Sequence, residues 1–221
     1  MAKLPPRLLW PAGFVLLLVA VALATPLLGL PNPIRQDIAN RLAGPLPGSP
    51  LGRDEFGRDV LSRLLWGART SLFVAFASAT IAALVGTLIG VASAWMRGVP
   101  EFLGVRLADI ILCFPPILLA LLAVTIMGPG VATLVTMLAI LYTPGFVRVS
   151  HAETTAARSQ DYVAAVAALG AGPMRIASRT LLPNIASPLL VQYSLTVAAA
   201  IVVESGLSFL GLGVIPPTPS W

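Results

Sequence analysis

Long runs without a charged side chain constrain this chain more than any other feature. A helix needs about 20 apolar residues to cross a bilayer core of roughly 30 Å. Uncharged runs of that order cover residues 8–34, 70–96, 110–147 and 180–203. The third run is too long for one span, and Gly128-Pro129-Gly130 divides it, because glycine and proline together end helices. The sequence therefore predicts five spans and an all-α polytopic membrane helix bundle.

The composition agrees with a chain that lies mostly in lipid. Hydrophobic residues make up 57% of it and charged residues only 10%, against roughly 25% charged in a soluble domain. A soluble globular domain, a disordered chain and a disulfide scaffold are thereby excluded. The one cysteine, Cys113, cannot form an intrachain disulfide or a cysteine metal cluster. Catalytic and metal-ligating clusters are likewise not expected.

The first apolar run has features of a secretory signal peptide. Lys3 and Arg7 precede it, and Ala22-Leu23-Ala24 resembles a cleavage site. The run is longer than a usual signal core, however, and four more candidate spans follow. We therefore expect an uncleaved first membrane helix.

Charge alone leaves the membrane topology ambiguous. Eight basic residues fall on the side of the N-terminus and six on the other, a thin margin for the positive-inside rule. The net charge of +5 suits anionic lipid headgroups, and no nucleic-acid-binding motif accompanies it. The first group is Lys3, Arg7, Arg97, Arg106, Arg148, Arg158, Arg175 and Arg179; the second is Arg35, Arg41, Arg53, Arg58, Arg63 and Arg69.

Small residues form a stripe on the second predicted span. Ala82, Gly86, Gly90 and Ala94 recur every four residues, which lets another helix approach closely. We expect helix packing within the subunit, with a subunit interface as the alternative.

Pro115-Pro116 should kink the next span. The kink could shape a pore or only fit the bundle.

Ionisable residues are scarce in the predicted spans. Asp109 and Glu204 lie at span edges, where we expect hydration or headgroup contacts. A proton- or sodium-coupled carrier normally needs such groups near the midplane. An ion channel or secondary carrier remains the rival hypothesis. A membrane enzyme is a weaker one, since His151, beside Glu153, is the single histidine and is expected to be a solvated surface residue.

Two polar segments separate the spans. Residues 31–69 are rich in proline and glycine and become helix-like from Arg58, where an amphipathic helix on the membrane surface is expected. Residues 97–106 form a short link. In 148–183, an Ala-rich helix should end at Leu169, and Pro173 should open a second helix that closes at Leu182-Pro183. A helix–turn–helix tied to membrane spans at both ends can act as a lever.

This segment resembles the EAA loop of ATP-binding-cassette importer permeases, Glu-Ala-Ala-x-x-x-Gly followed by Leu-Pro. Ala164 stands in place of the glutamate and Val166 in place of the second alanine, whereas Gly170 and Leu182-Pro183 match. The resemblance implies that residues of this loop couple the chain to an ATPase. The expected coupling residues are Tyr162, Ala164, Ala165, Gly170, Ala171, Leu182 and Pro183.

Two further segments resemble the dipeptide, oligopeptide and nickel group of these permeases, and specifically its C-type subunit. They are 49–72, with Arg53 in place of an expected threonine, and 204–221. The resemblance implies the type I importer permease fold with six spans. Because five are found, a sixth is expected to be missing from the C-terminal end. It also implies that the N-terminus and the loop lie inside and that 31–69 lies outside.

The resemblance implies the following organisation and partners. Residues 1–30 hold the N-terminal tail and first span, 31–69 the external loop and amphipathic segment, and 70–221 the permease core, with the coupling loop at 148–183.

The expected partners are a second homologous permease, two cytoplasmic ATP-binding subunits, an external substrate-binding protein and membrane lipid, but no nucleic acid. This chain is expected to be non-enzymatic and to bind no cofactor, with ATP and Mg²⁺ on the partner subunits, in the bacterial inner membrane.

Overall fold

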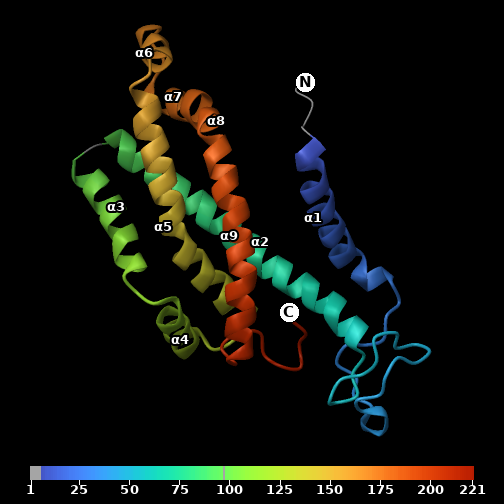
Figure 1. The fold of residues 1–221 in the computed structure, drawn as a ribbon. Helices are drawn as coiled ribbons and strands as arrows, with labels where there is room; N and C mark the ends of the chain where they lie inside the picture. Colours follow the sequence, from blue (N-terminus) through green and yellow to red (C-terminus); the bar gives the residue numbers. More distant parts are fainter. Residues whose placement is uncertain (1–5, 97) are drawn as a thin grey trace. The chain divides into compact units, whose positions relative to one another are not determined.

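The structure, a computed structural model, describes residues 6–96 and 98–221 (Figure 1). Lys3 and Arg97 of the charge comparison lie outside the described residues. Two compact units form: one comprises the chain up to Val74 together with Glu204–Trp221, the other Ala75–Val203. The helices are α1 (Pro6–Ala24), α2 (Val60–Met96), α3 (Val99–Leu112), α4 (Pro116–Met127), α5 (Val131–Arg158), α6 (Asp161–Ala168), α7 (Pro173–Ile176), α8 (Leu182–Asn184) and α9 (Ala186–Phe209).

The all-α membrane prediction is confirmed. Among the described residues, four segments are long and apolar enough to cross a membrane: Trp10–Leu27, α2, α5 and α9. The pair α3 and α4 makes a fifth if it is counted as one span, although it bends by 93°. The predicted break at Gly128-Pro129-Gly130 lies between α4 and α5, and the one at Pro115-Pro116 lies at the junction of α3 and α4, where Pro116 begins α4.

The bend between α3 and α4 follows from the proline pair. Pro115 has ψ 134°, an extended conformation that is favoured for a residue before proline. Pro116 then begins α4, where a missing N–H costs nothing. Two apolar helices of 14 and 12 residues result, each shorter than the bilayer core.

Three helix boundaries differ from the predictions. The prediction of a separate amphipathic helix from Arg58 is wrong, because these residues lead directly into α2. This helix starts at Val60 rather than at residue 70. Asp59 caps this start by accepting a 2.7 Å hydrogen bond from the Ser62 amide. The expected link 97–106 is largely α3. The last span runs over 186–209, not 180–203. A charged side chain does not by itself interrupt a helix, so the helix ends that were inferred from the positions of charged residues were wrong.

The first unit contains the polar loop 31–59. Asp54 accepts hydrogen bonds from the Phe56 and Arg58 amides, both 2.9 Å, and pairs with the Arg58 guanidinium at 2.6 Å. Burial raises the pKa of Asp54, but these hydrogen bonds outweigh it and hold the pKa below its ordinary value. Arg53 pairs with Asp37 at 2.6 Å and so joins two further parts of the loop.

Glu204 is fully buried in the same unit, so its expected hydration is wrong. Its two carboxylate oxygens accept hydrogen bonds from Ser71 (2.8 Å) and Ser208 (2.9 Å). The Ser71 hydroxyl oxygen in turn accepts a 3.1 Å hydrogen bond from the backbone N–H of Trp221. The carboxylate therefore links α2, α9 and the segment that follows α9.

Replacing Glu204 by leucine should destabilise this link. The hydroxyls of Ser71 and Ser208 would lose their acceptor. Ser71 is fully buried and Ser208 half-buried, and a buried polar group left unsatisfied costs about 1–3 kcal/mol. Glu204→Gln keeps an acceptor oxygen and serves as the matched control. Thermal unfolding in detergent should show a clearly lower midpoint for the leucine variant and a small change for the glutamine variant. Equal midpoints for leucine and wild type would show that the network contributes no stability.

Candidate functional site

The polar segment after α5 folds as a helix, a tight turn and a second helical region. α6 ends at Ala168, and Gly170 follows with φ 83°, a left-handed conformation that glycine adopts without a Cβ penalty. The Gly170 amide donates to the Ala167 carbonyl (2.9 Å) and the Ala171 amide to the Val166 carbonyl (3.3 Å). This is the Schellman pattern that ends helices. Its geometry depends on Gly170.

The second helical region begins as predicted but ends later. Pro173 is the first residue of α7, which bears out its assignment as a helix start. The predicted end at Leu182-Pro183 falls one residue before the observed end: a π-helical turn, Ala177–Leu181, runs into α8 (Leu182–Asn184), which contains both residues. Proline is tolerated because it lies in the first turn of α8, where its missing N–H has little effect. The helical path breaks at Ile185 instead.

A small hydrophobic core holds the segment together. Val163 of α6, Ile176 of α7 and Leu181 are buried against one another. Four partly buried residues pack on this core: Trp95 of α2, Ala157 of α5, Val166 and Ala171. Figure 1 shows α6, α7 and α8 gathered at one end of α5 and α9. We call residues 161–184 the loop domain; it rests on the ends of the long helices.

The residues expected to make contacts divide between two faces. Ala171 faces the small core, whereas the others lie on the outer surface: Tyr162, Ala164, Ala165, Gly170, Leu182 and Pro183. Two apolar residues that the sequence analysis did not select also lie there, Leu169 (88% exposed) and Met174 (80% exposed). They flank the turn, and their position next to Gly170 is the feature of the sequence that could have pointed to them. Exposed apolar side chains at a tip are typical of a protein-binding surface.

The small-residue stripe of α2 faces α5. A Cβ on Gly86 would lie 2.6 Å from both the Phe146 Cβ and the Thr143 carbonyl oxygen, and one on Gly90 would lie 2.5 Å from the Val147 carbonyl oxygen. Ala82 and Ala94 of the stripe are buried as well. The backbones of α2 and α5 therefore approach closely, and α5 continues into the loop domain through Ser159 and Gln160.

An ion pair and a histidine–carboxylate contact join α3 to α5 near the same end. Arg148 contacts Asp109 at 2.6 Å, and His151 Nε2 lies 3.1 Å from Glu101 Oε1. Asp109 and His151, which were expected to be solvated, are thus both paired. Across the described part of the chain, no group of three or more histidine, cysteine, aspartate or glutamate side chains is placed to hold a metal ion.

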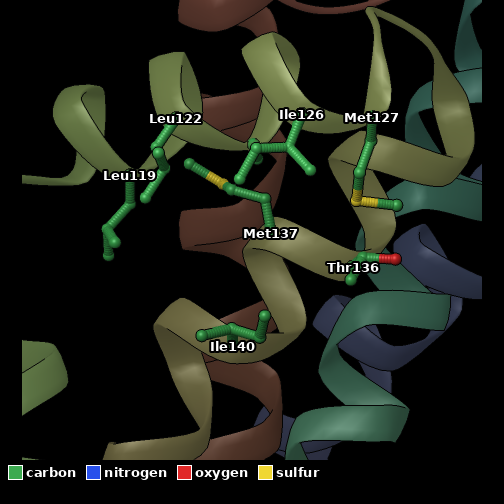
Figure 2. Close-up of a pocket in the computed structure, with 8 residues that line it drawn as sticks. Leu119, Leu122, Ile126, Met127, Thr136, Met137 and Ile140 are labelled. Carbon is green, nitrogen blue, oxygen red and sulfur yellow. The ribbon is translucent and has the colours of Figure 1, made fainter.

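A pocket of about 220 Å³ lies between α4 and α5. Figure 2 shows the side chains of both helices around it. Thr136 is the polar member of the lining, and its hydroxyl donates to the Ala132 carbonyl at 2.9 Å. The pocket therefore offers hydrocarbon contacts and suits an apolar group rather than a charged one. The lining residues are Leu119, Leu122, Ala123, Ile126, Met127, Thr136, Met137 and Ile140.

Comparisons with known proteins give consistent matches over most of the chain. Residues 84–221 match the family model described as "Binding-protein-dependent transport system inner membrane component". A di/tripeptide transport system permease protein of Pseudomonas aeruginosa is 40% identical, over 94% of this chain and 71% of the relative. A dipeptide transport system permease protein of Haemophilus influenzae is 34% identical, over 93% and 72%. A glutathione transport system permease protein of Pectobacterium atrosepticum is 35% identical, over 94% and 69%.

Proposed function

The chain belongs to the family of binding-protein-dependent transport system inner membrane components, and on that premise we propose that it carries the translocation pathway of an ATP-driven peptide importer. The chain is a transport permease subunit. Its part in the transport cycle is to change conformation when partner subunits bind and hydrolyse ATP. Peptides are the proposed substrate class because relatives carry the names di/tripeptide, dipeptide and glutathione transport permease.

The observation that carries the coupling role is the loop domain. It is folded on its own small core, it rests on α2 and α5, and it exposes Leu169 and Met174 at its turn. A partner that binds this tip can move the long helices as levers, because their ends are packed against the same core. Rigid-body movement of this kind is a common route between two states of a protein.

We assign the contacts to partners as follows. The exposed surface around Tyr162, Ala164, Ala165 and Gly170 docks on a cytoplasmic ATP-binding subunit, and two such subunits serve the complex. A second homologous permease completes the pathway, and an external binding protein delivers the substrate. ATP and Mg²⁺ bind to the partner subunits, since this chain has no Gly-x-x-x-x-Gly-Lys-Ser/Thr phosphate loop. The proposed location is the bacterial inner membrane.

The experiment is uptake by the complete importer reconstituted in vesicles. The binding protein is first screened by thermal shift against dipeptides, tripeptides, glutathione and a nickel chelate, and the stabilising ligand is radiolabelled. We expect uptake that requires both ATP and the binding protein, with a peptide as the ligand. Uptake that proceeds without ATP would support the channel or carrier rival. A nickel chelate as the ligand would overturn the substrate class alone.

A further inference from the structure

Arg158, the last residue of α5, reaches across to the end of α2. Its Nη1 group donates hydrogen bonds to the carbonyl oxygens of Ala94 and Trp95, the second over 3.1 Å. Its guanidinium carbon also lies 4.6 Å from the centroid of the Trp95 ring. One side chain thus holds both the backbone and the aromatic ring at this end of α2.

The end of α2 needs such a partner. α2 ends at Met96, so the carbonyls of its last turn have no intrahelical donor. A cation placed there is also favoured by the negative end of the helix dipole. Arginine suits this position because its planar, forked group can donate to carbonyls and stack on an aromatic ring together.

The Trp95 ring connects this clamp to the loop domain. Trp95 packs on the core formed by Val163, Ile176 and Leu181. α5 is joined to the loop domain through the backbone, whereas Trp95 brings α2 to it through side-chain packing. A displacement of the loop domain therefore acts on α5 directly and on α2 through the Trp95 ring and the Arg158 clamp.

We propose that Arg158 is a positioning residue that transmits movement of the loop domain to α2, so that α2 and α5 move together in the transport cycle. This inference rests on the proposed coupling function. If the clamp is lost, the ATP-binding subunits still dock on the exposed tip and hydrolyse ATP. The α2 helix then follows the loop domain less closely, and fewer substrate molecules cross per ATP.

The test measures substrate taken up per ATP hydrolysed by the complete importer in vesicles. Arg158→Ala removes the clamp, and Arg158→Lys keeps the charge but loses the planar fork. Trp95→Ala removes the shared partner, alone and combined with Arg158→Ala. The matched control is Arg106→Ala, because Arg106 also lies over an aromatic ring, that of Phe102 at 5.4 Å, but on the exposed face of α3.

We expect Arg158→Ala to lower uptake per ATP about tenfold while the ATP-binding subunits stay bound and hydrolysis falls less than threefold. Arg158→Lys should lower the ratio about threefold, Arg106→Ala should leave it unchanged, and the double variant should be no worse than either single one. An unchanged ratio in Arg158→Ala, or equal losses of uptake and hydrolysis, would overturn the inference. If Arg158→Ala fails to assemble, the ratio for Arg158→Lys decides in the same way.

The inference and the proposed function can fail separately. If ATP-binding subunits do not associate with the wild-type chain, the coupling function itself is wrong. If the wild-type importer is driven by ATP and Arg158→Ala remains equally well coupled, only the role of Arg158 is wrong.

Discussion

We expect Gly170→Pro to lower ATP-driven uptake by at least tenfold. Proline fixes φ near −65°, whereas Gly170 has φ 83°. Proline also removes the amide that donates to the Ala167 carbonyl over 2.9 Å. The turn between α6 and α7 cannot keep its shape, so the surface that carries Leu169 and Met174 is no longer presented to a partner. The measurement is uptake by the reconstituted importer, together with the amount of ATP-binding subunit that purifies with the chain.

The control for this variant is Gly170→Asn. Asparagine enters the left-handed region more readily than other side chains, and a Cβ at Gly170 meets no atom within 4 Å. We expect Gly170→Asn to keep more than half of the uptake. Uptake within twofold of wild type in the proline variant would show that coupling does not depend on this turn.

Gly90→Leu is the substitution with the largest expected effect on stability. The new side chain would collide with Ser150 Oγ and would start 2.5 Å from the Val147 carbonyl oxygen. Overpacking of this kind costs about 1–3 kcal/mol or more, and here rigid backbone rather than a flexible side chain must move. We expect the unfolding midpoint in detergent to fall by roughly 5 °C or more.

Gly206→Leu provides the matched comparison, because a Cβ at Gly206 of α9 meets no atom within 4 Å. Its unfolding midpoint should stay close to that of wild type. If both leucine variants unfold at the same temperature, the close approach of α2 to α5 does not stabilise the chain.

The sequence predicted the elements best where backbone chemistry decides them. Pro115-Pro116 and Gly128-Pro129-Gly130 break the apolar run whatever surrounds them, and Pro173 begins α7. Helix ends marked only by charge were predicted poorly. Arg63 and Arg69 lie within α2, because a charged residue has no effect on backbone hydrogen bonding and can extend into the interface or pair locally.

The site could be predicted only in part for a similar reason. Gly170 was recognisable because a helix–glycine pattern has a local cause. The clamp of Arg158 on Trp95 joins residues more than sixty positions apart, and nothing in either local sequence indicates the contact. Glu204 was misjudged because one of its two partners, Ser71, lies on α2, and the sequence does not specify that α2 and α9 meet there. The other partner, Ser208, lies four residues along α9 itself.

The most direct test of the coupling role of the loop domain is site-specific cross-linking from its turn. A photoreactive amino acid replaces Leu169, which is 88% exposed at the turn, or Leu122, which is 56% exposed at the α4–α5 pocket. In membranes that contain the whole importer, we expect cross-links from position 169 to the ATP-binding subunit and none from position 122. Absence of that cross-link at 169, with the importer intact and active, would contradict the coupling role of the loop domain.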